Sequence, residues 1–130
     1  MLEKNFKILS LVAMIVNGEK DVFQRIIDRE LPAEILMEDE LCVVIRDINP
    51  GAPVHVLIIP KKNIPRLAEA QENDAPVLGH LLLVARKFVE NHGLIGGFRV
   101  VINNGPDAGE SVPHLHVHLL AGKSMIWPPC

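Results

Sequence analysis

The sequence has few cysteines and none of the paired spacings that cysteine chemistry usually requires. Its 130 residues include only Cys42 and Cys130, and no CxxC unit occurs. This argues against a disulfide framework and a CxxC metal site, and it favours a reducing cytoplasm, with the nucleus as a further compartment in a eukaryote. Because Cys42 lies within the apolar run 41–45, we expect a small core residue rather than a reactive thiol.

The chain also lacks a block of charge of either sign. Its 13 Lys and Arg residues are interspersed among 16 Asp and Glu residues, and the formal net charge is −3. A protein that tracks a phosphate backbone typically carries a basic patch or tail. We therefore do not expect nucleic acid to be the main partner.

A membrane-spanning run is missing as well. The apolar stretch at 8–16 is much shorter than the roughly 20 residues that a spanning helix needs. It follows two lysines, as in a signal peptide, but Glu3 precedes it and no small-x-small cleavage site follows. We expect no membrane association, and we treat residues 1–20 as an N-terminal extension that forms an extra strand, a short helix or a poorly ordered segment.

Hydrophobic periodicity predicts one α+β domain over residues 21–130. A short helix is expected after Asp21, a suitable N-cap, and a longer helix over 74–91, with positions 77, 78, 81, 82, 85, 88 and 89 on its apolar face. Strand-like runs occupy 35–37, 41–46, 54–59, 98–102 and 114–120. Because helices and strands are segregated, we expect an antiparallel sheet of about five strands with one long and one short helix packed on it.

An alternation of histidines with aliphatic residues near the C-terminus is the most informative pattern. His114, His116 and His118 alternate with the aliphatic residues at 115, 117 and 119. Successive side chains of a strand point to opposite faces, so the three imidazoles should share one face while the aliphatic side chains enter the core. Half of the six histidines on one face indicate a site rather than scattered surface residues.

From the residues alone, two kinds of site remain open. Three imidazoles can bind zinc and leave one coordination position free, although no H-x-E or CxxC motif completes a metal signature. The preceding loop, 103–111, contains Gly105, Gly109 and Ser111, and such a loop can direct N–H and O–H groups at a phosphate. Taken by itself, the loop is better explained as an ordinary surface turn.

The segment SVPHLHVHLL at 111–120 resembles the His-φ-His-φ-His-φ-φ motif of the histidine-triad (HIT) superfamily, where φ is aliphatic. The blocks DVFxxII from 21, IxDINP from 45, HVLIIPKK from 55 and WPP from 127 are similar to its Hint branch, in the same order. This resemblance covers nearly all of 21–130. It implies a HIT-like fold whose sheet continues across a homodimer, and a cytoplasmic adenosine 5′-phosphoramidase that requires no metal or organic cofactor.

The resemblance also implies catalytic and phosphate-binding roles. His116 corresponds to the nucleophile, oriented by the backbone carbonyl of His114, and His118 to a phosphate ligand. His55 extends the imidazole network from the neighbouring strand. The remaining expected phosphate-binding residues are Ser111, Val112 through its backbone amide, and Asn103.

For the nucleoside, the resemblance implies that Asp47 accepts hydrogen bonds from the ribose hydroxyls. Trp127 corresponds to a residue that approaches the site of the partner subunit. The expected ligands are AMP, GMP and purine nucleoside phosphoramidates. The apolar residues expected around the base are Val22, Phe23, Ile26, Ile45 and Ile48.

Three residues depart from the pattern of the relatives. Glu110 stands where many of them carry Gln, which adds a negative charge near an anionic substrate. Arg46 and Asn104 also differ, and we expect both to face solvent. Two alternative functions stay open: hydrolysis of dinucleoside polyphosphates, as in the Fhit branch, and a nucleotide-binding scaffold with incidental hydrolysis.

Overall fold

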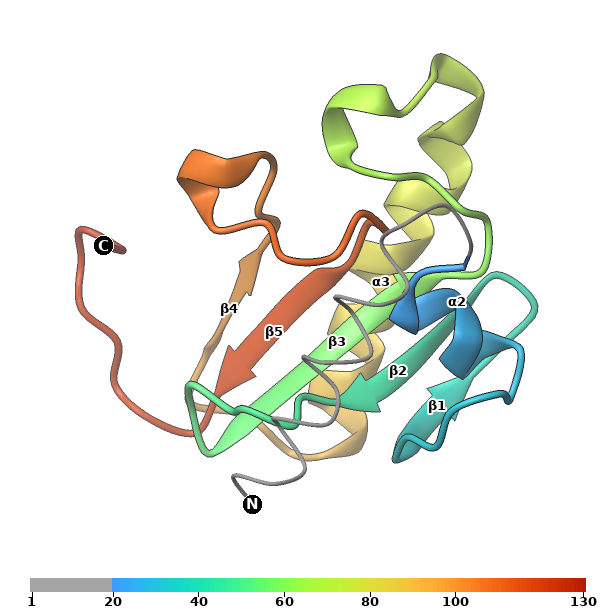
Figure 1. Cartoon of the computed structure of the whole chain (residues 1–130). Helices are drawn as coiled ribbons and strands as arrows, with labels where there is room; N and C mark the ends of the chain where they lie inside the picture. The colour runs from blue at the N-terminus through green and yellow to red at the C-terminus, as the bar shows by residue number, and fades with distance from the viewer. Residues whose placement is uncertain (1–19) are drawn as a thin grey trace.

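The computed structural model describes residues 20–130 and contains a five-stranded antiparallel sheet with a helix on each face (Figure 1). The strand order is β1-β2-β3-β5-β4, so β1 and β4 form the edges. The strands are β1 (Ile35–Glu38), β2 (Cys42–Arg46), β3 (Val54–Pro60), β4 (Phe98–Val101) and β5 (Val117–Ala121). The predicted α+β architecture is confirmed, and the expectation for residues 1–19 lies outside the described residues.

The central strands are apolar on both faces because each face is covered. Val44, Val56 and Ile58 join the cluster beneath the long helix α3 (Ala75–Asn91), whereas Val43 and Ile59 join a second cluster beneath the short helix α2 (Val22–Ile27). Alternate residues of one strand therefore enter different cores. Cys42 is 1% exposed in the α3 cluster, as predicted.

Helix α2 begins where the sequence predicts it. The carboxylate of Asp21 accepts the backbone N–H of Gln24 at 2.8 Å, which satisfies one of the free donors of the first turn. Val22, Phe23 and Ile26 are buried against the sheet. The helix thus holds two successive apolar side chains close to the strand ends where the site forms.

The apolar face of α3 differs from the predicted one at two positions. Val84 is 5% exposed and belongs to the core, whereas Leu82 is 52% exposed and faces solvent. The other predicted face residues are buried or partly buried. Pro76 lies in the first turn, where its missing N–H removes no helical hydrogen bond.

The last strand starts later than predicted, at Val117 rather than His114. The N–H of Leu115 donates to the carbonyl of Ile64 at 2.7 Å, and the N–H of His114 donates to Val112 at 2.8 Å, so this part of the segment does not pair with β3. The predicted alternation still holds, because residues 115, 117 and 119 are buried in the α3 cluster.

Three short 3₁₀ helices were not predicted. They are η1 (Leu67–Glu69), η2 (Glu72–Asp74) and η3 (Pro106–Ala108). Each lies in a connection rather than in a core element. The other predicted boundaries agree with the observed elements to within one residue.

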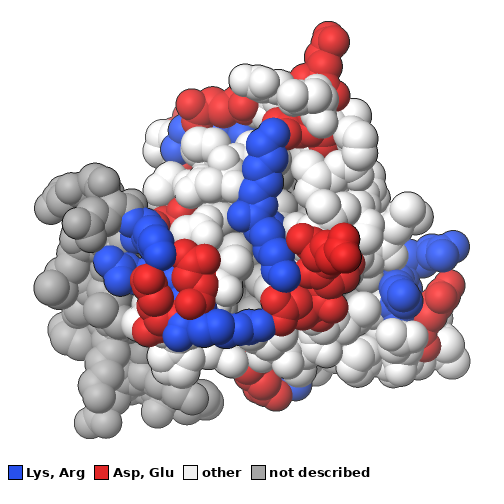
Figure 2. Space-filling view, turned by 90° about the vertical axis from the view of Figure 1, so that its right-hand side faces the viewer, with Lys and Arg blue, Asp and Glu red and all other residues white. Residues whose placement is uncertain are grey.

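Charged residues of both signs are mixed on the face shown in Figure 2. In the described part of the chain, Lys20 forms an ion pair with Asp28 at 2.7 Å, and Lys61 forms one with Glu38 at 2.9 Å. Among residues 20–130, this face presents no continuous basic surface. Within residues 20–130, no helix combines the length and apolarity needed to cross a membrane.

The packing of α3 leads to a stability prediction. Phe88 is 2% exposed in the α3 cluster, so Phe88→Ala should lower the free energy of unfolding by about 3–5 kcal/mol through lost burial and a cavity. Leu82→Ala on the same helix is the matched control and should change it by less than about 1 kcal/mol. Urea unfolding measures both, and equal losses would contradict this packing.

Candidate functional site

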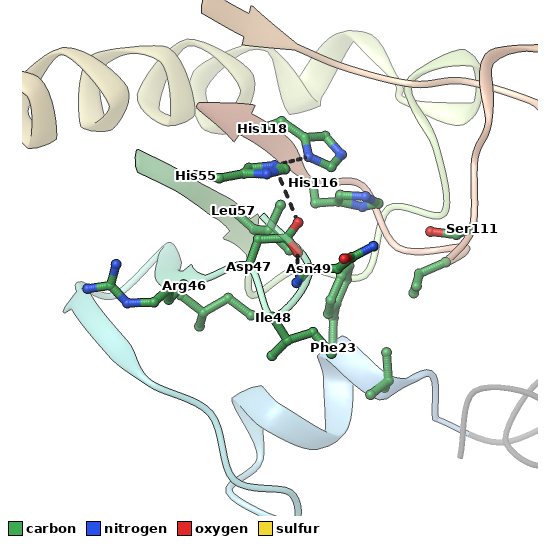
Figure 3. A pocket seen from close by; sticks show the side chains of 13 residues that line it. Phe23, Arg46, Asp47, Ile48, Asn49, His55, Leu57, Ser111, His116 and His118 are labelled. Atoms are coloured by element: carbon green, nitrogen blue, oxygen red, sulfur yellow. Dashed lines mark hydrogen bonds and ion pairs between the residues drawn. The ribbon is translucent and has the colours of Figure 1, made fainter. Parts of the chain in front are cut away.

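A cavity of about 460 Å³ opens on the α2 face of the sheet, at one end of the strands. Its walls come from α2, from the end of β2 and the loop after it, from β3, and from the segment 111–118 (Figure 3). Apolar side chains surround one part, and imidazole, carboxylate and hydroxyl groups converge on the other. The lining residues are Val22, Phe23, Ile45, Arg46, Asp47, Ile48, Asn49, His55, Leu57, Ser111, Val112, His116 and His118.

His116 has a fixed ring orientation. Its Nδ1 lies 2.7 Å from the carbonyl oxygen of His114, which can only accept, so Nδ1 carries the hydrogen. The Phe23 ring and the imidazole pack in a T-shaped arrangement at a centroid distance of 4.9 Å. In the neutral ring, Nε2 therefore has a free lone pair on a side chain that lines the cavity.

A second imidazole is oriented by a chain of hydrogen bonds. The N–H of Gly51 donates to Nδ1 of His55 at 2.9 Å, so His55 carries its hydrogen on Nε2. That Nε2 lies 2.9 Å from Nδ1 of His118 and 3.3 Å from Oδ2 of Asp47. When His118 accepts from His55, its own hydrogen is on Nε2, the nitrogen left free to donate to a ligand.

Strand register explains why these two histidines meet. Leu57 on β3 pairs with His118 on β5, and His55 pairs with Leu120. His55 and His118 are therefore diagonal neighbours on one face of adjacent strands, within reach of long side chains. The loop after β2 then brings Asp47 against them (Figure 3).

Two of the three histidines that line the cavity, His116 and His118, are held neutral at pH 7. Burial lowers the pKa of His118 to about 4, and the neighbouring His116 and His55 act in the same direction. Burial also lowers the pKa of His116 below its ordinary value. A neutral imidazole at position 116 can act as a nucleophile, whereas an imidazolium cannot.

His114 shares this face but lies beneath the cavity. It is fully buried, with Nε2 at 2.8 Å from the carbonyl oxygen of Pro60 and Nδ1 at 3.2 Å from Oδ2 of Asp21. Its backbone carbonyl accepts from His116. The three predicted imidazoles are thus together, two at the cavity wall and one behind it.

Comparison with known proteins agrees with this geometry. The HIT domain family matches residues 28–125. The chain belongs to this family. An uncharacterized HIT-like protein of Synechococcus elongatus is 50% identical over 112 residues, which cover 86% of this chain and 98% of that protein.

Two further proteins are similar to this chain over most of their length. A 14 kDa zinc-binding protein of Zea mays is 49% identical over 110 residues, covering 83% of this chain and 86% of that protein. A solved structure described as a HIT family hydrolase from Legionella pneumophila Philadelphia 1 matches with a TM-score of 0.82 and 40% identity. The match covers 84% of this chain and 98% of the Legionella chain.

The loop before the HIT motif is held closed by Glu110. Gly105 and Gly109 adopt positive φ values of 89° and 82°, and the N–H of Gly105 donates to the Glu110 carboxylate at 3.0 Å. Nε and Nη2 of Arg66 donate to the two carboxylate oxygens at 3.0 and 3.1 Å. These contacts lower the pKa of Glu110, with Arg66 the larger cause. The charge predicted from the Gln-to-Glu departure is therefore paired with a cation.

Four of the predicted site residues lie outside the cavity wall of the single chain. Ile26 is buried in the α2 cluster, and His114 is beneath the cavity. Asn103 is not a lining residue, and Trp127 is 81% exposed. Every other predicted site residue lines the cavity.

Three lining residues were not predicted from the sequence. Leu57 is explained by its register opposite His118, and Asn49 by the turn in which its N–H donates to Asp47 at 2.8 Å. Arg46 is exposed, as predicted, yet it also borders the cavity, and its Nε donates to Glu34 at 2.8 Å.

The other departure expected to face solvent, Asn104, is exposed and accepts the N–H of Ala68 at 2.7 Å.

Two groups of side chains within residues 20–130 have the composition of metal ligands. One is Asp47, His55 and His118, within the cavity. The other, Asp39, Cys42 and His80, fits a metal poorly: Nε2 of His80 already contacts Oδ2 of Asp39 at 2.6 Å. Burial also raises the pKa of the Cys42 thiol to about 12.

The shifted pKa of His118 predicts how stability depends on pH. Because the folded-state pKa of about 4 lies below the ordinary value of 6.5, the unfolded chain binds more protons between these values. Stability contributed by neutral His118 should therefore fall as the pH drops from about 6.5 toward 4. We expect the unfolding free energy of His118→Gln to decline less over this window, measured by urea unfolding; parallel profiles would contradict the shift.

Proposed function

We propose that this protein hydrolyses the P–N bond of adenosine and other purine nucleoside 5′-phosphoramidates through a covalent nucleotidyl-His116 intermediate. Aminoacyl-adenylates are further substrates of the same chemistry. The observation that carries the proposal is the 2.7 Å hydrogen bond from His116 Nδ1 to the carbonyl of His114, which leaves Nε2 as the free nitrogen at the cavity. The similarity to a solved structure described as a HIT family hydrolase supports the reaction class.

In the first step, Nε2 of His116 attacks the α-phosphorus, a P–N(His) bond forms, and the P–N bond to the leaving group breaks. The amine departs after accepting a proton from solvent, and the water that attacks in the second step returns a proton to solvent. His118, through its Nε2–H, and Ser111, through its hydroxyl, are hydrogen-bond donors on the cavity wall that can bind the phosphate oxygens. Donors placed where charge develops stabilise the transition state more than the ground state.

In the second step, water attacks the same phosphorus and the bond to His116 breaks. The nucleoside monophosphate is released, and His116 returns to its neutral form because its Nδ1–H has stayed on the carbonyl of His114. No metal or organic cofactor takes part in either step.

The apolar part of the cavity suits a purine nucleoside. Phe23, Ile45 and Ile48 offer flat and aliphatic surface for a base, and the volume of about 460 Å³ falls in the range of small-molecule sites. Asp47 is 16% exposed at the side chain, with Oδ1 accepting from Asn49 and its remaining lone pairs available to ribose hydroxyls.

The Hint-type homodimer and the cytoplasmic location remain proposals. The exposed apolar side chains at one end of the molecule favour a second copy: Ile126 is 79% exposed, and Trp127 is 81% exposed. Phe98 on the edge strand β4 is 44% exposed. Pairing of β4 with its symmetry mate would continue the sheet and cover this surface.

The nucleophile is tested by His116→Ala. This variant should lose turnover of an adenosine 5′-phosphoramidate by a factor of about 10³ or more, since it cannot form the covalent intermediate, while AMP still binds in calorimetry. His80→Ala, on α3 and outside the cavity, is the histidine control and should retain wild-type turnover. Full activity in His116→Ala would refute the assignment.

The same preparations separate the related reactions. Mass spectrometry of enzyme quenched during turnover should find AMP on the peptide that contains residues 114–118. Faster cleavage of diadenosine polyphosphate than of the phosphoramidate would favour the Fhit-type activity instead. A scaffold role predicts that protein partners captured by the wild type are also captured by His116→Ala.

Zinc binding is a second candidate function, favoured by the name of the Zea mays relative and by one side-chain group. The nitrogens of His55 and His118 and the Oδ2 of Asp47 are separated by 2.9 and 3.3 Å along the chain of contacts. Tetrahedral zinc with bonds of about 2.0–2.2 Å places ligand atoms roughly 3.3 Å apart, so the spacing of this donor set fits. To bind zinc, His55 would have to release the hydrogen on Nε2 and break the hydrogen bond that its Nδ1 accepts from Gly51. Bound zinc would supply Lewis-acid polarisation of a phosphate oxygen.

Metal removal distinguishes the two candidates. Because His116 does not belong to this donor set, we expect phosphoramidate turnover to survive dialysis against EDTA, with zinc well below one equivalent in the purified protein. Elemental analysis and the turnover assay measure this. One tightly held equivalent that is lost in both His55→Gln and His118→Gln would establish the zinc site.

A further inference from the structure

A fully buried histidine lies behind the proposed nucleophile with an acceptor at each ring nitrogen. His114 is 0% exposed. Its Nε2 contacts the carbonyl oxygen of Pro60 at 2.8 Å, and its Nδ1 contacts Oδ2 of Asp21 at 3.2 Å. A carbonyl oxygen has no hydrogen to donate, so Nε2 must be protonated.

The state of Asp21 decides the charge on His114. Burial opposes ionisation of Asp21, but hydrogen bonds with His114 and with the N–H of Gln24 outweigh it and lower the pKa of the carboxyl below its ordinary value. An ionised carboxylate only accepts hydrogen bonds. Nδ1 of His114 must then donate as well, which makes the ring an imidazolium.

We propose that Asp21 and His114 form a buried carboxylate–imidazolium pair that positions the nucleophile His116. An isolated charge is unstable in an apolar interior, whereas a pair with satisfied hydrogen bonds persists. His114 acts on the reaction through its backbone carbonyl, so it and Asp21 are positioning residues. The catalytic part of this inference rests on the proposed function; the charge state of the pair does not.

Asp21 connects two parts of the site. It caps α2, whose Val22 and Phe23 form a wall of the cavity, and it also holds the residue whose carbonyl orients His116. The Phe23 ring also makes T-shaped contacts with both histidines, at centroid distances of 4.9 Å to His116 and 6.3 Å to His114. One carboxylate thereby fixes the pocket wall relative to the nucleophile.

The surroundings of His114 assign its charge partner without ambiguity. From α2 it meets the Asp21 carboxylate and the Phe23 ring, from β3 the neutral carbonyl of Pro60, and from its own segment the neutral His116. Within the described part of the chain, Asp21 is the carboxylate that forms an ion pair with this ring.

Histidine ¹⁵N NMR of the full chain tests the charge state without a substrate. The wild type should show hydrogens on both ring nitrogens of His114 at pH 7, while His116 and His118 each show one. In Asp21→Asn, the amide can cap α2 and contact His114 without a charge, so His114 should be neutral with its hydrogen on Nε2. A neutral His114 in the wild type, or an imidazolium in Asp21→Asn, overturns the pairing.

Steady-state kinetics test the positioning role. Asp21→Ser can still cap the helix, but its side chain is one atom shorter and cannot reach His114. Its kcat should fall roughly tenfold while KM changes less than about threefold, because the α2 cluster still holds the pocket wall. Asp21→Asn restores the contact and should lie within about threefold of wild-type kcat.

Asp28→Asn is the matched control at the other end of α2, where the carboxylate pairs with Lys20 and does not contact the site. It should leave kcat unchanged. Wild-type kcat in Asp21→Ser overturns the positioning role. If the wild type turns over no phosphoramidate, the proposed function fails while the NMR result still decides the pair. If Asp21→Ser does not fold, Asp21→Asn decides. A neutral His114 and a wild-type kcat in Asp21→Asn support the pair, whereas an imidazolium at position 114 of this variant refutes it.

Discussion

One hydrogen bond, from the Nδ1–H of His116 to the carbonyl of His114, sets the orientation on which the site depends. It fixes the tautomer of His116, aims the other ring nitrogen at the cavity and ties the side chain to the backbone that carries it. That backbone is held in turn by the hydrogen bond from the N–H of Leu115 to the carbonyl of Ile64, and by the contact of the buried His114 ring with the carbonyl of Pro60. A nucleophile that cannot rotate gives up little freedom when it reacts.

The sheet makes this rigidity compatible with an open site. Its two faces bury separate clusters, so α3 and the residues at 115, 117 and 119 supply a continuous core on one side. The other side is only partly covered by the six-residue helix α2, and the cavity lies beside that helix. The same strand thus contributes packing through one set of side chains and chemistry through the other.

The sequence predicts the parts of the site that depend on local periodicity. Alternation around His116 places the imidazoles on the face opposite the aliphatic residues, and Asp21 is recognisable as a helix cap. The start of β5 was mispredicted because a tertiary hydrogen bond from Leu115 to Ile64 diverts the chain before the strand. Likewise, the contact between Asp21 and His114 spans 93 residues, and no periodicity reveals such a partner.

The site that we propose binds a phosphate has little net positive charge, because most of its charged groups are neutralised or paired. His116 and His118 are neutral, Glu110 is matched by Arg66, and the carboxylate of Asp21 faces His114. A ground-state anion therefore meets oriented dipoles rather than a net positive charge. Such dipoles interact most strongly where negative charge accumulates, on the oxygens of a five-coordinate phosphorus, and uniform tight binding of substrate would not accelerate the reaction. The carboxylate of Glu110 is compatible with this setting because Arg66 neutralises its charge.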